Sequence, residues 1–478
     1  MKLLKKVSSM PDGVKASFAF FFASVITSGI SYIVTPIYTR ILEKEVFGQV
    51  SVFLTWLEIF GILAMFCLSY GVFNNGMIDH PDKRDEYSFS MLILSNVITT
   101  FFTLVILAIY PLIKEFVGID LKLIILMCAV FYVQPAYKFW TARQRYELKY
   151  KKTVIWTIVC ALASPTVAIT CILTCDGNDL YARLFGAELV LIAIYVGFYI
   201  YLGIKGKWKV NFKYWKMALL FNLPLIPHYL STYLLGNSNK LLIKNLIGDA
   251  EVAYYSVAQM VATVVTIVWS AINSSLIPYT YEKCKKEEYS DISRVVMPIL
   301  TMFAVVCVMA MMFAPEVVAI MATKDYVEAI YVIPPIVGGV FFQVQYYIYA
   351  NVVYYYKKPR YVMFASVTSV ILNFVLGYFL ITEFGYLAAG YSTLICYFLQ
   401  ATLDYLAMKK VVKKKIYNMR YVGVLSLIVA LIAIFSNLLY GNILIRYGIV
   451  LALAILCVIF RKKIIGLIKE IKGKKNEN

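Results

Sequence analysis

The amino-acid sequence predicts an all-α polytopic membrane protein of about fourteen transmembrane helices. Of its 478 residues, 61% are hydrophobic and 15% are charged, whereas soluble domains carry about 25% charged residues. Long stretches carry no formal charge, among them 88–113 and 252–281, and a helix needs about 20 apolar residues to cross the hydrocarbon layer. Because these apolar runs are continuous rather than alternating, they favour helices over a β-barrel.

The predicted spans follow one another with short connections. They are 16–38, 46–72, 88–113, 120–140, 153–174, 183–204, 217–236, 252–278, 295–314, 328–353, 361–381, 385–408, 420–440 and 443–460. A weak internal similarity links Phe47–Val52 with Ala253–Val257, six spans later, which a parallel repeat of two six-helix lobes would explain. We therefore expect one lobe over 1–211, a second over 212–416, two further helices over 417–460, and a basic cytoplasmic tail over 461–478.

The placement of lysine and arginine predicts the orientation. With the N-terminus inside, 37 of the 46 basic residues fall on the inner side of the membrane and 9 on the outer side. This asymmetry follows the positive-inside rule and places both termini in the cytoplasm. Inner anionic headgroups account for most of the net charge of +19, so we expect membrane lipids as partners and no nucleic acid.

Several classes of chemistry find no support in the sequence. The nine cysteines are scattered without a C-x-x-C pair, and there are two histidines, so we expect no metal site. No glycine-rich nucleotide loop follows a strand, and we expect no cofactor. The first span lacks a cleavage site and is expected to remain as a helix. The short outer loops argue against a membrane enzyme such as a sugar polymerase or a lipid-dependent glycosyltransferase.

Five stretches carry a family resemblance. They read TPIYTRILEKEVFG (35–48), NLPLIPHYL (222–230), SLIP (275–278), YYYKKP (354–359) and NFVLGYFLITEFGYLAAG (373–390). In this order they resemble the polysaccharide-export flippases, the Wzx-type oligosaccharide flippases of the multidrug/oligosaccharidyl-lipid/polysaccharide exporter superfamily. The chain departs from that pattern at Asn239-Lys240, where the family often has an acidic-basic pair, and at Ala253, where a glycine is common.

The resemblance implies two six-helix lobes around a central cavity and alternating access. It implies that a polyprenyl-pyrophosphate-linked oligosaccharide moves from the inner to the outer leaflet of the bacterial cytoplasmic membrane, for O-antigen, capsule or exopolysaccharide synthesis. A polysaccharide polymerase and glycosyltransferases of the same pathway are then expected partners. The alternative is a cation-coupled drug or metabolite antiporter of the same fold. Such exporters often place a carboxylate in the first helix, and 16–38 has none.

Three outer cations are candidates for holding the pyrophosphate. Arg40 lies at the outer end of the first span, and Lys240 and Lys244 lie at the corresponding end of the second lobe. Cationic side chains bind phosphate oxygens through charge-assisted hydrogen bonds. The alternative is that these side chains extend to the outer headgroups.

A set of polar side chains in the second lobe forms a predicted sugar-binding face. The set comprises Gln343, Tyr346 and Asn351 of the tenth span with Gln259 and Asn273 of the eighth. Amides that bridge neighbouring helices would give the same pattern.

Four residues are candidates for coupling or gating. Glu58 is the one formal charge in its span, and a carboxylate at that depth must face a wet cavity, be paired or be protonated. Pro224 and Pro227 should kink the seventh span into a hinge. His228 follows them, either to titrate or to hydrogen-bond a neighbour.

Overall fold

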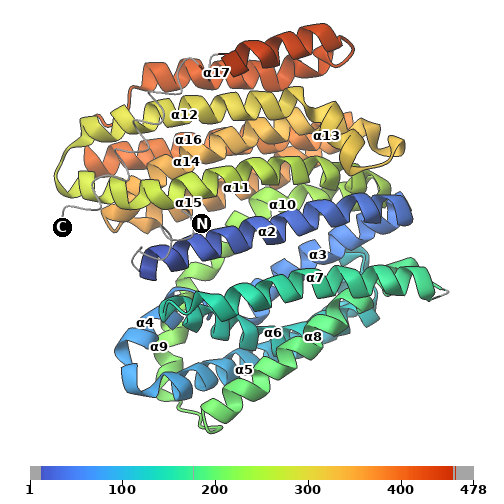
Figure 1. The fold of residues 1–478 in the computed structure, drawn as a ribbon, viewed down its shortest axis with the longest axis vertical. Coiled ribbons are helices and arrows are strands. Elements are labelled where there is room, and N and C mark those ends of the chain that lie inside the picture. The colour runs from blue at the N-terminus through green and yellow to red at the C-terminus, as the bar shows by residue number, and fades with distance from the viewer. Residues whose placement is uncertain (1–11, 176, 456–457, 459–478) are drawn as a thin grey trace, which may run out of the picture. The chain divides into compact units, whose positions relative to one another are not determined.

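The computed structural model describes residues 12–175, 177–455 and 458, and these residues form helices and no strand. The chain divides into two compact units, with the boundary between Tyr233 and Leu234. The boundary lies inside one helix, α10 (Ile226–Leu246), near the end of the seventh predicted span, 217–236. The all-helical fold predicted from composition is confirmed (Figure 1).

The first unit contains the first six predicted spans and most of the seventh. Its elements are α2 (Asp12–Ile41), α3 (Lys44–Ala64), α4 (Gly71–Asp79), η1 (Pro81–Lys83), α5 (Arg84–Val117), α6 (Leu121–Tyr146), α7 (Tyr150–Thr174), α8 (Asp179–Lys205), α9 (Lys213–Asn222) and η2 (Leu223–Leu225). The 34 residues of α5 reach about 50 Å at 1.5 Å per residue, well beyond the hydrocarbon thickness.

The second predicted span is wrong at its end. The sequence predicts one helix over 46–72, but α3 stops at Ala64 and a separate helix, α4, begins at Gly71. Between them Phe66 and Cys67 adopt left-handed backbone conformations, with φ of 56° and 49°. An L-residue in that conformation cannot continue a right-handed helix. Apolar composition runs unbroken through the turn, and hydropathy therefore does not reveal it.

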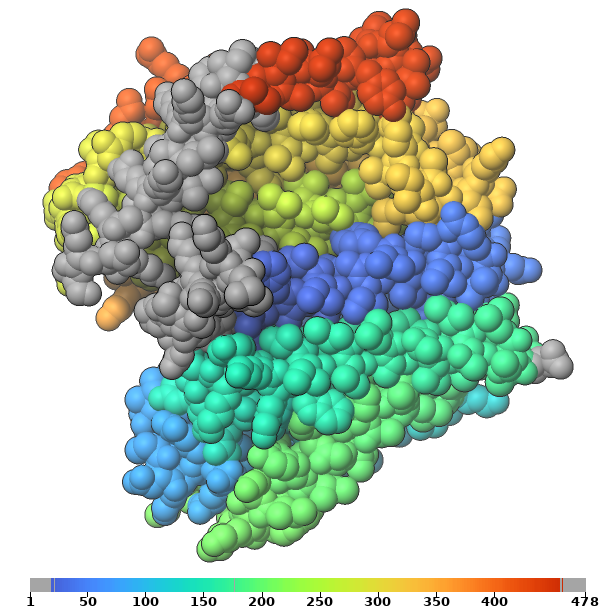
Figure 2. Space-filling view, in the orientation of Figure 1, coloured from blue at the N-terminus to red at the C-terminus, as the bar shows by residue number. Residues whose placement is uncertain are grey.

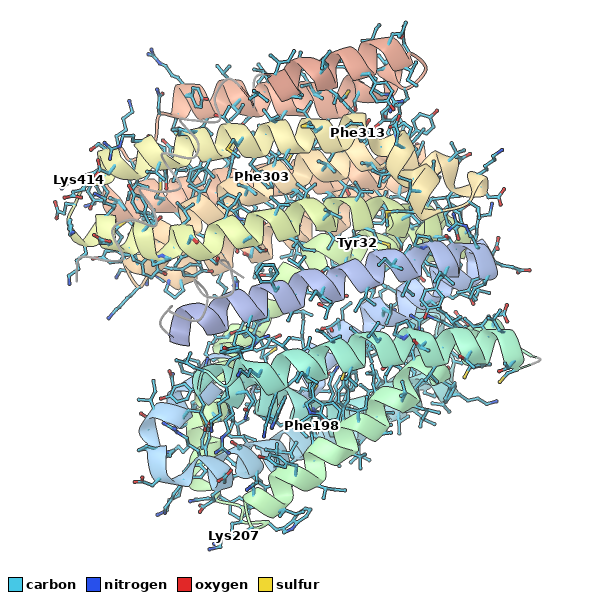
Figure 3. The ribbon with its side chains drawn as sticks, in the orientation of Figure 1. Tyr32, Phe198, Lys207, Phe303, Phe313 and Lys414 are labelled. Atoms are coloured by element: carbon cyan, nitrogen blue, oxygen red, sulfur yellow. The ribbon has the colours of Figure 1, made fainter. Side chains whose placement is uncertain are left out.

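An aromatic cluster packs at the edge of the core of the first unit. Phe198 of α8 (Figure 3) lies between Tyr137, Trp140 and Trp156, with its ring centroid 4.7–5.1 Å from theirs. Aromatic pairs at these separations contribute beyond their buried area. By contrast, α7 is mostly exposed and lies beside α2 on the face seen in Figure 2.

The second unit contains the remaining spans. Its elements after α10 are α11 (Asp249–Lys285), α12 (Tyr289–Met312), α13 (Ala314–Met321), η3 (Lys324–Tyr331), α14 (Ile333–Tyr355), α15 (Pro359–Phe384), α16 (Ala388–Val412), α17 (Met419–Phe435), η4 (Ser436–Leu439) and the apolar helix Ile443–Ile455. The tenth predicted span, 328–353, begins late, because Pro334 and Pro335 suit the first turn of a helix and start α14 there.

The central helix of the second unit is α14. It packs against α11, α12, α15, α16 and α17, and 89% of its most apolar stretch is buried. Close approach of α16 depends on Gly338, where an added Cβ would lie 2.9 Å from Leu394 and 2.8 Å from Ala433 of α17. Small residues at such crossings bring membrane helices together.

Twelve helices of the described residues are long and apolar enough to cross a membrane. Two predicted spans are not among these twelve. The helix α16, whose inward face is polar, lies where the twelfth span was predicted, and the shorter helix Ile443–Ile455 lies where the fourteenth was predicted. Large apolar side chains cover the outside of the helices: Leu112 is 85% exposed, Phe101 70% and Leu173 67%. Water-soluble monomers rarely expose apolar surface on this scale. The chain is a multi-pass membrane protein.

Candidate functional site

Arg40 is exposed at the C-terminal end of α2. Its Nη1 donates a hydrogen bond to the carbonyl oxygen of Pro36, one turn earlier, at 2.6 Å. This bond holds the guanidinium against its own helix. A guanidinium has five N–H groups, so one such bond leaves it able to hold an anion through the others.

Glu58 is exposed on α3. Within the described residues its carboxylate has no hydrogen bond and no ion pair. Its charge lies within electrostatic range of Cys67 and Tyr70, in and after the turn that ends α3, and of Tyr233 on α10. The structure therefore places this carboxylate on an open face of the first unit, and it is not paired within the described residues.

The seventh span is interrupted at its prolines, as the sequence predicts. The 3₁₀ turn η2, which contains Pro224, separates α9 from α10, and Pro227 is the second residue of α10. The ring of His228 is part-buried, and its Nδ1 has no hydrogen-bond partner among the described residues. The alternative that His228 hydrogen-bonds a neighbour is therefore not met through Nδ1 within the described residues, although its carbonyl oxygen accepts from Thr232 at 2.9 Å.

The two candidate lysines of α10 differ in their surroundings. Lys244 forms an ion pair with Asp249 at the start of α11, with 2.9 Å between the charged atoms. Lys240 is part-buried, and its ammonium makes no ion pair or hydrogen bond with any described residue. A part-buried, unpaired ammonium is costly unless a ligand or water satisfies it. Of the two, Lys240 is therefore the better placed to hold an anion.

The five predicted sugar-binding side chains lie in the second unit, and four of them bond to neighbouring helices. Asn351 of α14 donates to Asn273 of α11 at 2.9 Å. Gln343 donates to the hydroxyl of Tyr397 on α16 at 3.2 Å. Tyr346 is 4% exposed. These bonds match the helix-bridging alternative that the sequence left open.

Gln259 retains an unused acceptor. Its Nε2 donates to the carbonyl oxygen of Gly236 at 2.7 Å and to Asn237 at 3.2 Å, both on α10. Its Oε1 is buried without a partner among the described residues. Of the predicted sugar-binding amides, this is the one with a buried polar atom that has no partner among the described residues, and a ligand hydroxyl could satisfy it.

A buried polar knot around Asn239, directly before Lys240, was not predicted. The Asn239 Nδ2 lies 2.7 Å from the carbonyl oxygen of Ala389, 2.8 Å from the hydroxyl of Thr393 and 3.0 Å from that of Ser392, all on α16. Asn239 is 1% exposed. The departure from the family pattern at this position was visible in the sequence, but the acceptors that surround it come from 150 residues away.

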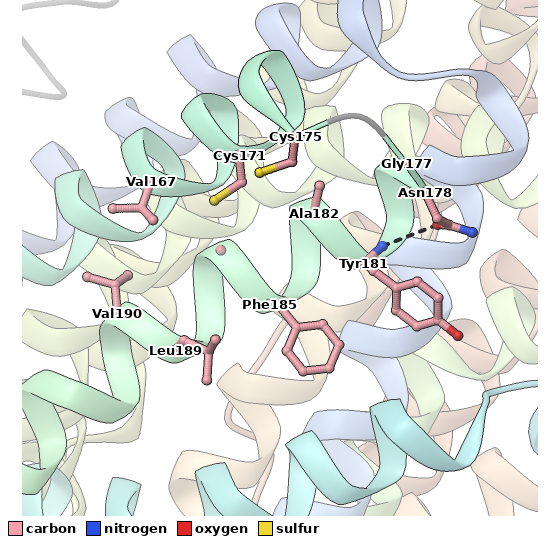
Figure 4. Close-up of a pocket in the computed structure, with 11 residues that line it drawn as sticks. Val167, Cys171, Cys175, Gly177, Asn178, Tyr181, Ala182, Phe185, Leu189 and Val190 are labelled. Atoms are coloured by element: carbon pink, nitrogen blue, oxygen red, sulfur yellow. Dashed lines mark hydrogen bonds between the residues drawn. The ribbon is translucent and has the colours of Figure 1, made fainter.

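The groove shown in Figure 4 lies between α7 and α8 of the first unit. Its lining includes Cys171, Tyr181, Phe185 and Leu189 and no charged side chain. The one hydrogen bond drawn there is a helix cap, from the Tyr181 amide to the Asn178 side chain. With no cation, the groove is unsuited to a phosphate and is better suited to an apolar chain.

The comparisons with known proteins indicate a family of polysaccharide biosynthesis proteins. A family model described as "Polysaccharide biosynthesis protein" matches residues 14–283, more than half of the chain. The chain is also 25% identical over 203 residues to a protein of the Lsg locus of Haemophilus influenzae. That match covers 41% of this chain and 51% of the relative, so the chain spans about half the length of this curated relative.

Two solved transporter structures share the fold. The lipid II flippase MurJ, in an inward closed conformation, aligns with a TM-score of 0.63 at 14% identity, over 94% of this chain and 100% of that one. An inward-facing multidrug resistance MATE family transporter of the MOP superfamily aligns with a TM-score of 0.62 at 14% identity, over 80% and 94%. The family resemblance inferred from the motifs is thus confirmed: the chain belongs to the polysaccharide biosynthesis protein family and has the fold of the MOP-superfamily transporters.

Proposed function

We propose that this protein is a flippase that moves a polyprenyl-pyrophosphate-linked oligosaccharide from the inner to the outer leaflet of the bacterial cytoplasmic membrane by alternating access. One combination of observations carries the proposal: a polysaccharide-biosynthesis family match on a fold shared with transporters, one of them a lipid II flippase. The protein would act as a transporter rather than an enzyme, in the service of O-antigen, capsule or exopolysaccharide synthesis.

The cargo requires cations for its pyrophosphate, polar groups for its sugars and an apolar surface for its lipid tail. Arg40 and Lys240 are the proposed phosphate anchors, because the first is exposed and the second is unpaired within the described residues. Gln259, with its free Oε1, is the proposed sugar contact. Lys244 and the other amides would take part only by exchanging the partners that they have here.

The proposed orientation follows from the basic residues. With 37 of 46 lysines and arginines on one side, both termini lie in the cytoplasm. The prolines that interrupt the seventh span are the proposed hinge, since the 3₁₀ turn η2 separates α9 from α10 there. A polymerase and glycosyltransferases of the same pathway would supply and consume the cargo.

A cation-coupled drug or metabolite antiporter is the second candidate, because the likeness to a multidrug transporter is nearly as strong as that to the flippase. The two candidate functions predict different phenotypes in cells that lack the gene. A flippase mutant accumulates lipid-linked repeat units on the inner leaflet and loses surface polysaccharide. An antiporter mutant keeps its polysaccharide and becomes sensitive to an exported compound.

The experiment that tests the proposal is a deletion strain analysed for lipid-linked repeat units in each leaflet. We expect repeat units trapped inside and restored export with the wild-type gene. Unchanged surface polysaccharide in the deletion strain would refute the flippase assignment.

Two variants test the proposed residues in the complemented strain. Arg40→Ala should abolish export while membrane insertion stays normal, whereas Lys114→Ala, another exposed cation on the predicted outer side, should export normally. Glu58→Gln should reduce any dependence of export on an ion gradient. Normal polymer with Arg40→Ala would remove that residue from the site, and unchanged gradient dependence would remove Glu58.

A further inference from the structure

Asp404 of α16 is a buried carboxylate that the structure leaves without a partner. It is the one formal charge in the predicted span 385–408, and it is 0% exposed. Neither Oδ1 nor Oδ2 has a hydrogen-bond partner among the described residues, and no ion pair reaches them there. A bare carboxylate in such surroundings costs far more than a fold can recover. Something other than a described side chain must therefore compensate this charge.

Two further buried oxygen atoms without a partner among the described residues lie along α15 and α16. Gln400 precedes Asp404 by one helical turn and shares its face. Its Nε2 donates to Ser366 of α15 at 3.1 Å, while its Oε1 is buried without a partner. Ser369, about one turn beyond Ser366, has a buried hydroxyl that is also unpartnered. The helices α15 and α16 are antiparallel, with Ser366 opposite Gln400 and Gly377 near Ser392. Ser369 therefore lies on the far side of Gln400 from Asp404, about 10 Å along the axis.

No described cation offsets the charge of Asp404. Asp404 lies within electrostatic range of two titratable side chains, Tyr346 and Tyr354, both on α14. The buried face that α15 turns toward α16 contributes hydroxyl and amide groups. At the end of α16 itself, Lys409 and Lys410 are exposed, and Lys410 lies over the ring of Tyr361.

We propose that Asp404 and Gln400 form a binding site for one monovalent cation, a proton or Na⁺, inside the second unit. A proton on Asp404 would turn it into a donor that can reach the free Oε1 of Gln400, so that two orphaned groups satisfy each other. A sodium ion would be held by the same oxygens, which are the ligands that hard cations prefer. A divalent ion is disfavoured, because no cluster of three acidic, histidine or cysteine side chains exists in the described part of the chain.

This inference goes beyond the proposed transport and needs no cargo for its test. Infrared spectra of the purified full-length protein in nanodiscs would report the carbonyl stretch of un-ionised carboxyls at pH 7, in choline chloride. Wild type should show one such carboxyl more per chain than Asp404→Asn. The matched control Asp325→Asn, which removes an exposed carboxyl of the same unit, should leave the band unchanged.

The two cations are distinguished by exchange of the salt. If the site binds only a proton, the Asp404 band disappears on raising the pH and is unaffected when Na⁺ replaces choline. If it binds Na⁺, the band falls with added Na⁺ at constant pH, in proportion to occupancy. Should Asp404→Asn fail to fold, wild type with ¹³C-labelled aspartate carboxyls identifies the same band by its isotope shift. Absence of any aspartate band at pH 7 together with no response to Na⁺ would overturn the proposal.

Discussion

The knot around Asn239 permits a quantitative prediction for the stability of the second unit. Asn239→Leu keeps a similar shape and removes the amide that faces α16. The Nδ2 group has two hydrogens, so two strong hydrogen bonds are lost, although four acceptors lie within reach. The carbonyl oxygen of Ala389 keeps its bonds from the hydroxyls of Ser392, at 2.9 Å, and Thr393, at 3.2 Å. The substitution therefore leaves that buried acceptor satisfied.

The magnitude follows from these two lost bonds. At about 1 kcal/mol each the substitution costs about 2 kcal/mol, and the lower average of about 0.6 kcal/mol found between membrane helices gives about 1 kcal/mol. The ratio of unfolded to folded protein should thus rise roughly five- to thirty-fold. A hydrophobic replacement outside the knot should have little effect, because it breaks no bond between helices.

The assay is reversible unfolding of the purified protein in mixed micelles of increasing SDS content, with Asn245→Leu as the matched control. Asn245 lies on the same helix, is exposed, and donates only to the Leu241 carbonyl of its own helix at 2.9 Å. If Asn239→Leu proved as stable as Asn245→Leu, the hydrogen bonds around Asn239 would contribute nothing, and our account of the knot would be wrong.

Two further predictions concern ion pairing and helix packing. Burial by itself would raise the pKa of Glu316, but its bidentate bonds from Arg446, at 2.6 and 2.7 Å, lower that pKa below its usual value. The pair should therefore stabilise the fold fully above about pH 4.5 and lose its effect as the pH falls through the lowered pKa. Glu316→Gln should lower the free energy of unfolding by about 1–3 kcal/mol at pH 7. Unfolding curves recorded at falling pH should show a progressively smaller difference between the variant and the wild type. In α8, Gly186→Val should destabilise the fold by about 1–3 kcal/mol, because even a Cβ at Gly186 would lie 3.0 Å from the Cα of Ala168 on α7. The control Gly197→Val should leave the melting temperature nearly unchanged, because nothing lies within 4 Å of a Cβ there. Equal melting temperatures for the two valine variants would contradict the packing argument.

The burial of charged side chains within the spans is a feature that the sequence alone does not predict. Glu58 is the one formal charge in its predicted span, and Asp404 is likewise the one formal charge in 385–408, so the same sequence argument applies to both. Yet the two carboxylates differ in a way that periodicity cannot express: Glu58 is exposed on its unit and Asp404 is fully buried. Burial depends on which neighbouring helix covers a face, and all faces of a membrane helix carry apolar residues. Hydropathy therefore carries little information about which face is covered.

What the sequence determined by itself is the helical membrane fold, the approximate positions of its spans and the family to which it belongs. These follow from local properties, since charge-free runs must be helical in lipid and the prolines of the seventh span interrupt a helix wherever it packs. The tertiary structure alone decided that the chain turns after Ala64, that Gln343 and Asn351 bond to other helices, and that Asn239 meets α16. Those features depend on pairs of residues far apart in the chain, whose approach is an outcome of packing rather than of composition.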